Sequence, residues 1–210
     1  MTNKCPLCFE PASYFSGSRD KEFWQCSNCA AVFLSSKYYL SPEDEKNRYL
    51  MHHNDVNDPR YQKFVRPIVE SVVKYCQKAH VGLDFGCGTG PVISKLLLDQ
   101  GYKIEQYDPF FRDQPGLLDE KYDYIVCSEV IEHFREPAKE FKLLRALLNP
   151  GGKLFCLTER YSPEIDFDGW YYKNDPTHVF FYQDRTFEWI RDNFHFPALT
   201  IEGRLVVLSA

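Results

Sequence analysis

The sequence contains no apolar run that approaches the roughly 18 residues needed to span a membrane as a helix. Its first residues, Met-Thr-Asn-Lys-Cys, also lack the apolar core of a secretory signal. We therefore expect no membrane association and a cytoplasmic location.

Positive charge is scarce, with 25 Lys and Arg residues against 30 Asp and Glu residues and a net charge of -5. No bulk positive field favours nucleic-acid binding, although a local basic face is still compatible with this balance. Apolar residues make up 44% and aromatic residues 16% of the chain, which indicates a compact fold rather than disorder. A length of 210 residues suits one domain with a small appendage.

Four of the eight cysteines are paired in sequence, as Cys5-Pro-Leu-Cys8 and Cys26-Ser-Asn-Cys29. In a reducing compartment this spacing predicts a four-thiolate zinc site rather than disulfides. Four protein ligands complete a tetrahedral shell, so the site is expected to be structural, within a zinc ribbon over residues 1–35. The alternatives are four unconnected thiols or a redox pair, and two matched pairs exceed what redox chemistry needs.

Residues 36–80 are expected to form a linker and a leading helix. Ser41-Pro42 is a helix-start pattern, and apolar residues at helical spacing predict an amphipathic helix over 60–78 in which Pro67 marks a kink or a later start. Between them, Tyr49 and His52 belong either to a polar loop or to a lid that contacts substrate.

The stretch Val81–Gly90 predicts a buried strand, a glycine loop and a helix start, which together form a cradle for a nucleotide-like cofactor. The glycines are spaced G-x-G-x-G, and Pro91 stands where a dinucleotide fingerprint has its third glycine. A second strand ends at Asp108, where an acid accepts hydrogen bonds from ribose hydroxyls. Glu105 lies inside that strand and is the less suitable acid.

Together with Asp84, the glycine loop reads D-x-G-x-G-x-G, which resembles motif I of class I S-adenosylmethionine-dependent methyltransferases. Tyr122–Phe134, with its E-V-x-E-H-F end, looks like motif IV, and the N-P-G-G-K-L run at 149–154 is common in the same family. The resemblance implies an α/β, Rossmann-like sheet over residues 81–210, mostly parallel with an antiparallel last strand. A cysteine-rich leader followed by Y-x-x-H-x-N is also similar to zinc-ribbon methyltransferases.

The resemblance implies S-adenosyl-L-methionine as cofactor, with a binding set that combines the glycine loop, the second strand's end and motif IV. The implied cofactor residues are Asp84, Gly86, Cys87, Gly88, Gly90, Tyr107, Asp108, Pro109, Ser128, Glu129 and His133. Asp84 would support the loop and the methionine amino group, or merely cap the loop's amides. Cys87 is most simply a small residue that the loop tolerates.

One departure from the family concerns the third strand. Residues 109–121 leave too little chain between Asp108 and Tyr122 for a normal helix, strand and helix. The third strand should therefore be reduced, and Phe110 or Phe111 would stack on the adenine.

The aromatic segment 168–182 should cap the acceptor pocket, with Trp170, Tyr171 and Tyr172 contacting substrate. His178 is the candidate general base, because an imidazole titrates near neutral pH, and His133 is the second catalytic candidate. The alternatives are that His178 only ties a loop to backbone and that His133 only starts a helix.

The sequence thus predicts an enzyme that transfers a methyl group to an O, N or C acceptor on a small metabolite or sugar. One alternative is an RNA or protein methyltransferase that docks its substrate through the ribbon. Another is a non-catalytic, nucleoside-sensing zinc module. The oligomeric state is not indicated.

Overall fold

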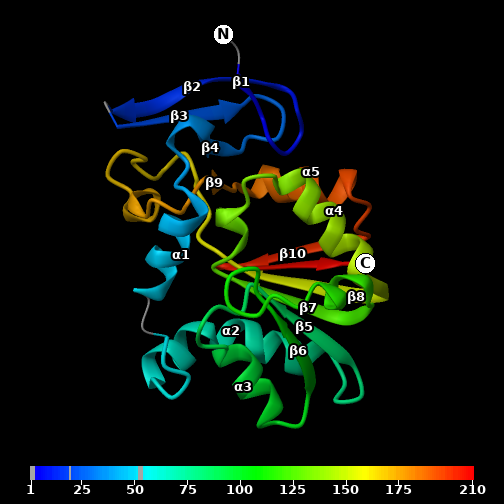
Figure 1. The fold of residues 1–210 in the computed structure, drawn as a ribbon. Helices are drawn as coiled ribbons and strands as arrows, with labels where there is room; N and C mark the ends of the chain where they lie inside the picture. The colour runs from blue at the N-terminus through cyan, green and yellow to red at the C-terminus, as the bar shows by residue number, and fades with distance from the viewer. Residues whose placement is uncertain (1–2, 19, 52–53) are drawn as a thin grey trace.

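The computed structural model describes residues 3–18, 20–51 and 54–210, so the predicted substrate residue His52 lies outside the described residues. These residues form two sheets, one of six strands and one of five. The larger sheet carries helices on both faces, and the smaller one sits beside it at the N-terminal end of the chain (Figure 1).

The larger sheet has the strand order β10-β11-β8-β7-β5-β6. Its parallel part consists of β5 (Val81–Phe85), β6 (Lys103–Tyr107), β7 (Tyr122–Ser128) and β8 (Leu148–Leu157). At one edge, β11 (Leu205–Ser209) runs antiparallel to β8, and β10 (Ala198–Glu202) runs antiparallel to β11. The predicted mostly parallel sheet with an antiparallel last strand is confirmed.

The reduced third strand is also confirmed. Between β6 and β7 the described chain contains only a single bridge, Asp108 with Arg112, and a short 3-10 helix over Pro115–Asp119. The sheet therefore ends at β6, and the loop after Asp108 is free to form a wall of the site.

Helices cover both faces of this sheet. On one face lie α2 (Pro59–Tyr75) and α3 (Val92–Leu98), and on the other α4 (Pro137–Leu147) and α5 (Asp184–Asn193). Side chains along β7 alternate accordingly, since Val126 packs in the α2–α3 cluster and Ile125 in the α4 cluster. Within the described chain, no helix has both the length and the apolarity required to cross a bilayer.

The smaller sheet combines the cysteine-rich segment with a strand from far along the chain. Its order is β1 (Asn3–Lys4), β2 (Pro11–Ser18), β3 (Lys21–Cys26), β4 (Val32–Leu34) and β9 (Phe180–Phe181), all antiparallel. The predicted ribbon segment 1–35 thus supplies four strands, and β9 supplies the fifth. Its buried residues continue into the hydrophobic cluster of the larger domain.

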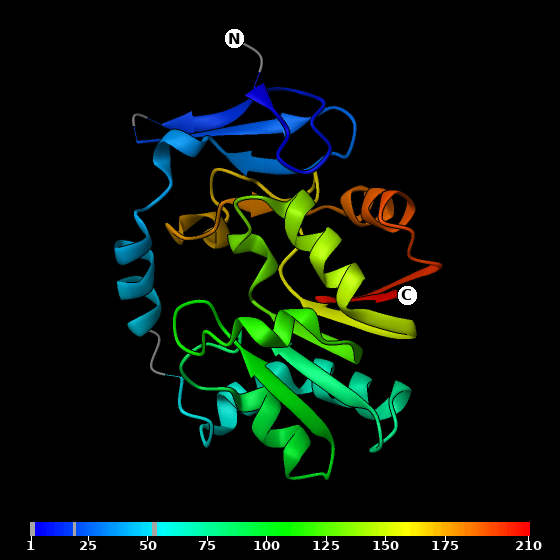
Figure 2. The same cartoon turned by 45° about the vertical axis from the view of Figure 1, so that its right-hand side comes forward.

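A short helix, α1 (Pro42–Leu50), connects the two sheets along one side of the molecule (Figures 1 and 2). The Ser41 side chain accepts a hydrogen bond from the Asp44 amide, and Pro42 occupies the first helical position, as the sequence pattern predicts. We call residues 40–51 the strap. The leading helix starts at Pro59 and contains Pro67, so that proline does not mark its start.

The hydrogen bonds that join the ribbon to α5 give a first testable prediction. Thr186, fully buried, donates from its hydroxyl to the Cys29 carbonyl (2.9 Å) and accepts from the Gln183 amide (3.0 Å). Thr186→Val should lower the free energy of unfolding by about 1–3 kcal/mol, because both backbone groups lose their partner. Thr186→Ser keeps the hydroxyl and is the control in chemical denaturation. Equal losses in the two variants would contradict this.

Candidate active site

A large cavity of about 1130 Å³ opens at the carboxyl ends of β5, β6 and β7. In an open α/β sheet this edge is where ligands bind. The volume exceeds the roughly 300–1,000 Å³ of an ordinary small-ligand site, so it can hold two ligands side by side.

The glycine loop forms the floor of one end of the cavity. Gly86 and Gly88 have φ values of +80° and +63°, which residues with a Cβ rarely adopt. A Cβ on Gly88 would meet no atom within 4 Å, so the loop leaves open space there, whereas one on Gly86 would reach Val130 at 2.6 Å. Gly90 instead lies against the segment around Asn54, because a Cβ added at Gly90 would lie 1.9 Å from the Asn54 carbonyl oxygen.

Asp108 holds this end of the cavity together. Its carboxylate accepts hydrogen bonds from the amides of Gly88 (2.9 Å), Phe110 (2.8 Å) and Phe111 (3.1 Å). A carboxylate has about four lone-pair sites, so one more donor can bind. The side chain thus fixes the loop geometry and retains capacity for a ligand hydroxyl. Its expected contact with a ribose stays a prediction.

Asp84 lies beneath the loop and is not part of the cavity wall. Its carboxylate accepts a hydrogen bond from the Ser94 hydroxyl of α3 (2.7 Å). Burial raises the pKa of Asp84 to about 6, and the hydrogen bonds from Ser94 oppose this only in part. Asp84 therefore joins the strand end to α3.

Glu129 and Glu132, in the turn after β7, both contact the hydroxyl group of Tyr172. The Tyr172 hydroxyl lies 2.5 Å from Glu132 Oε1 and 3.2 Å from Glu129 Oε2, and Arg204 donates to Glu129 (2.6 Å). Burial raises the pKa of Glu132 to about 7, and burial together with the charge of Glu132 raises the pKa of Glu129 to about 8. The positive φ of Glu129, 52°, turns the chain sharply at the end of β7.

His133 and His178 face each other across the cavity wall, with ring centroids 4.8 Å apart. Nδ1 of His133 lies 2.9 Å from the Thr177 carbonyl oxygen, and Nδ1 of His178 lies 2.7 Å from that of Tyr172. A carbonyl oxygen only accepts, so both rings carry a proton on Nδ1, and the neutral form of each ring has its lone pair on Nε2. Burial lowers the pKa of His133, which favours its neutral form.

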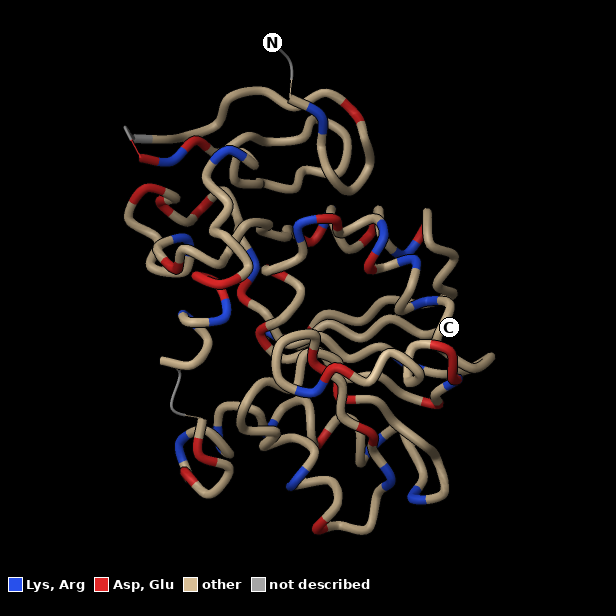
Figure 3. Tube along the Cα trace, in the orientation of Figure 1, with Lys and Arg blue, Asp and Glu red and all other residues tan. Residues whose placement is uncertain are grey.

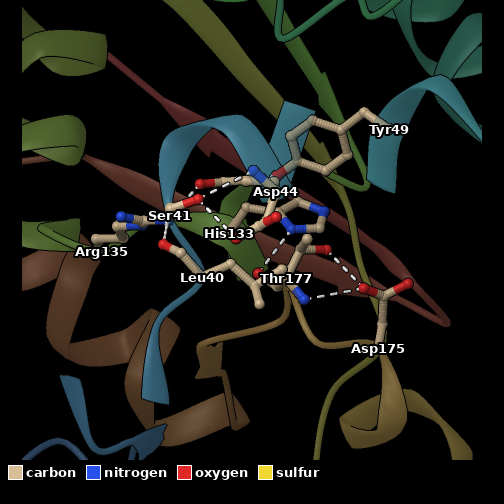
Figure 4. Close-up of polar contacts among 9 residues, drawn as sticks. Leu40, Ser41, Asp44, Tyr49, His133, Arg135, Asp175 and Thr177 are labelled. Atoms are coloured by element: carbon tan, nitrogen blue, oxygen red, sulfur yellow. Dashed lines mark hydrogen bonds and ion pairs between the residues drawn. The ribbon is translucent and has the colours of Figure 1, made fainter. Parts of the chain in front are cut away.

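The strap contributes Pro42, Glu45, Arg48 and Tyr49 to the cavity lining. Figure 4 shows Leu40, Ser41 and Tyr49 of the strap close to His133 and Arg135. Arg135 donates to the Leu40 carbonyl (2.8 Å) and to Glu45 (2.5 Å), and Arg48 donates to Asp175 (2.7 Å). Although burial opposes it, hydrogen bonds from Thr177 and Arg48 hold the pKa of Asp175 well below its usual value. These ion pairs anchor both ends of α1 to the turn at 133–135 and the loop at 174–177.

Tyr49 at the end of α1 reaches both halves of the cavity. Its ring centroid lies 5.7 Å from that of Phe110 on the glycine-loop side and 5.3 Å from that of His133 on the other side. The predicted lid residue is thus placed between the two candidate ligand positions, and Phe110 and Phe111 both line the cavity.

The structure brings most of the predicted site residues to this one cavity. Its wall includes Gly86, Cys87, Gly88, Tyr107, Asp108, Pro109, Ser128, Glu129, His133, Tyr49, Tyr171, Tyr172 and His178. Asp84, Gly90 and Trp170 are not on the wall, and Trp170 instead packs against Tyr161 and Phe181.

Several side chains of the site escaped the sequence analysis. Glu132 is fully buried behind the wall; it belongs to the E-V-x-E-H-F motif, but the sequence analysis gave it no role. Arg204 and Asp175 come from the last strand pair and the aromatic segment. Nothing local marks them, because their partners Glu129 and Arg48 are far away in sequence.

The four predicted metal cysteines form a separate cluster in the ribbon. Their sulfur atoms lie within 4.8 Å of one another, with Cys5–Cys29 at 3.6 Å and Cys8–Cys26 at 3.3 Å. Four thiolates at about 2.3 Å from a tetrahedral centre would be about 3.8 Å apart, so the cluster fits a zinc ion after a small expansion.

Comparison with known proteins settles the family. A family model described as a methyltransferase domain matches residues 58–200, more than half of the chain. The chain belongs to the methyltransferase domain family. The predicted family is therefore confirmed.

Curated relatives of this methyltransferase share part of its length. A ubiquinone biosynthesis O-methyltransferase of Aeromonas salmonicida is 29% identical over 41% of this chain and 37% of its own. One from Histophilus somni is 30% identical over 36% of this chain and 43% of its own. The chain thus spans less than half the length of these relatives.

Solved structures share the fold of this methyltransferase. The 1,6-didemethyltoxoflavin-N1-methyltransferase of Burkholderia thailandensis, solved with 1,6-didemethyltoxoflavin and S-adenosylhomocysteine, aligns with a TM-score of 0.59 and 14% identity over 95% of this chain and 98% of that chain. A SAM-dependent methyltransferase from Archaeoglobus fulgidus aligns at 0.54 with 19% identity, over 67% and 72%. At these identities the likeness shows the fold alone.

The buried carboxyl of Asp84 gives a pH-dependent prediction. Its pKa rises from 3.8 unfolded to about 6 folded, so folding favours the protonated form, and its contribution to stability is lost as pH rises through that window. Asp84→Asn keeps an oxygen for Ser94 without the charge. At pH 8 it should be more stable than wild type by up to about 3 kcal/mol, and this advantage should vanish near pH 4.

The measurement is urea unfolding across this pH range. Asp113→Asn, at an exposed position, is the matched control and should change stability little at any pH. An advantage of Asp84→Asn that grows toward acid pH would contradict the burial argument.

Proposed function

We propose that this protein is an S-adenosylmethionine-dependent methyltransferase that acts on an oxygen of a small hydroxylated acceptor. The observation that carries the proposal is the shared cavity, in which a glycine loop with an acid at one end faces histidines and tyrosines at the other. Both reactants of a direct transfer must meet in one space, and this cavity has room for two ligands.

The glycine-loop end fits the cofactor. The open space over Gly88 and the remaining acceptor capacity of Asp108 suit a ribose and the adjoining chain. Phe110 and Phe111 offer apolar surface for the adenine where the third strand is reduced. When bound, S-adenosylmethionine supplies a methyl group already activated by a positively charged sulfur. The protein's task is therefore to orient the acceptor and to exclude water.

The opposite end suits a small acceptor with a hydroxyl group. Tyr49, Tyr171 and Tyr172 provide aromatic walls, and the Nε2 lone pairs of His133 and His178 are oriented by backbone carbonyls. Oxygen is favoured over nitrogen because the curated relatives are O-methyltransferases. The general-base role of His178 stays a prediction.

A macromolecular substrate is less well supported. Along the chain, Lys and Arg are interspersed with Asp and Glu and do not gather on one element (Figure 3). The ribbon is joined through the pairing of β4 with β9 to the segment that carries His178, and residues of the strap line the cavity. We therefore propose that the ribbon is a scaffold, and that an RNA or protein acceptor is the alternative for the test to decide.

The function is tested by calorimetry and labelled-methyl transfer. Wild type should bind S-adenosylmethionine and S-adenosylhomocysteine but not NAD, and should transfer label to small phenols or polyols rather than to RNA. Asp108→Asn should weaken cofactor binding about tenfold or more, because an amide N–H then faces a backbone N–H. The exposed Asp113→Asn is the control. Tight binding of NAD alone would overturn the assignment, and label in RNA would change the acceptor class.

We also propose that Cys5, Cys8, Cys26 and Cys29 hold one structural zinc ion. The two cysteine pairs share one local geometry: Phe9 and Ala30 each follow a pair with φ near +60°, at 63° and 61°. Each of these two residues donates its amide to the carbonyl of the first cysteine of its pair. Matched turns of this kind present both thiols of a pair to one centre.

Elemental analysis tests the zinc site. Wild type should contain about one zinc per chain, and Cys26→Ser should lose it and unfold at lower temperature, because metal binding contributes to folding free energy. Cys76→Ser, which removes a buried thiol outside the cluster, should keep its zinc. Zinc-free wild type, or full occupancy in Cys26→Ser, would disprove the site.

A further inference from the structure

The reduced third strand leaves β6 at the edge of the larger sheet. Among the described strands, β6 pairs only with β5, and no strand lies on its other side (Figure 1). The segment 109–121 does not cover this edge, because its Leu117 and Leu118 pack against the cluster on the α4 face of the sheet. A sheet edge with unpaired backbone groups is a template for a further strand.

The alternation of the backbone along β6 determines which groups point outward. The Tyr107 carbonyl accepts from the Gly86 amide (2.8 Å) and therefore faces β5, whereas the backbone of Asp108 points to the other side, where it pairs with the following loop. Successive residues of a strand alternate in this way, so Ile104 and Gln106 present their N–H and C=O groups at the open edge. No described residue outside β6 forms a hydrogen bond with these groups.

This edge is complementary to itself. Lys103 and Glu105 are exposed and lie on the same face of the sheet. When a second copy pairs antiparallel with Ile104 opposite Ile104, Lys103 of each copy lies opposite Glu105 of the other. In the same register the two Ile104 residues exchange both backbone hydrogen bonds, and the Gln106 amide of each copy reaches the Tyr102 carbonyl of the other.

The two charges select one register. A pairing centred on Glu105 would place two glutamates directly opposite each other, which destabilises a strand pair. A lysine on an edge strand commonly prevents pairing. Here an acid two residues further along the same strand neutralises it, but only in the pairing centred on Ile104.

The helix next to β6 adds apolar surface to this edge. The last residue of α3, Leu98, is 50% exposed, and the cluster on the α3 face includes Ile104. The Tyr102 amide donates to the Leu97 carbonyl (3.0 Å), so the end of α3 lies beside the start of β6. Antiparallel pairing makes equivalent faces of two sheets continuous, and the two α3 helices would then lie on one face and cover Leu98.

We propose that β6 pairs antiparallel with β6 of a second copy of this chain, centred on Ile104, and joins the two larger sheets into one. The partner is a second copy because both edge charges are neutralised in the twofold register. The backbone of Asp108 is already paired with Arg112, so the joined strands end before the loop that forms the cavity wall. Each copy therefore keeps a complete cavity.

Analytical ultracentrifugation of the full-length protein tests the pairing. Wild type should show a reversible equilibrium between monomer and dimer at micromolar concentration. Lys103→Glu and Glu105→Lys should each weaken association by about tenfold, because each change makes two favourable cross-strand pairs unfavourable. The double variant Lys103→Glu/Glu105→Lys restores opposite charges across the edge and should associate as wild type does.

Arg185→Glu is the matched control, since it changes the net charge as Lys103→Glu does. Arg185 is exposed on α5, which packs at β10, the opposite edge of the sheet. This variant should associate as wild type does. A wild type that is monomeric at every concentration, or a dimer that both single variants leave intact, would overturn the proposal.

Hydrogen exchange locates the interface. The Ile104 and Gln106 amides should exchange slowly in the wild-type dimer and faster in Lys103→Glu at the same concentration, and equal exchange in the two would count against the pairing. Calorimetry with S-adenosylmethionine separates this inference from the proposed function. Lys103→Glu should bind the cofactor as wild type does, since each cavity is complete within one chain, and loss of cofactor binding together with the dimer would contradict that part.

Discussion

Two backbone hydrogen bonds of Val179 hold the acceptor end of the cavity in position. Its carbonyl accepts from Leu34 in the ribbon (2.9 Å), and its amide donates to Glu132 in the turn after β7 (2.9 Å). The neighbouring residue His178 is thereby fixed between the two sheets. The ribbon is therefore part of the architecture of the site, because the strand pairing of β4 with β9 positions the loop that carries a site histidine.

Much of the fold could be predicted from local patterns. The glycine loop after β5, the acid after β6 and the apolar β7 each follow from a few adjacent residues, and the short interval 109–121 correctly indicated a missing strand. The addition of β9 to the ribbon sheet could not be foreseen. Phe180 and Phe181 form an aromatic pair without alternation, and their partners Val32 and Phe33 lie some 150 positions earlier in the chain.

The position of site residues could be predicted where they belong to a local sequence motif. Most residues chosen from the loop and the E-V-x-E-H-F motif do line one cavity, because strand ends place them at the same edge of the sheet. Tertiary contacts place the remaining residues. Asp84 accepts a hydrogen bond from Ser94 and Trp170 packs in an aromatic cluster, so their predicted ligand contacts stay predictions. Arg204 and Asp175 reach the cavity through partners distant in sequence.

The glycines of the G-x-G-x-G motif are required for two different reasons, and Gly90 differs from the other two. Gly86 and Gly88 are required by backbone conformation next to the cavity, whereas Gly90 leaves room for the Asn54 carbonyl just beyond the strap. A larger residue at Gly90 would first displace that chain segment. If such a variant bound the cofactor more weakly, the cause would be the displaced segment around Asn54 and not the loop itself. The third glycine of this motif therefore indicates that another chain segment packs against the loop.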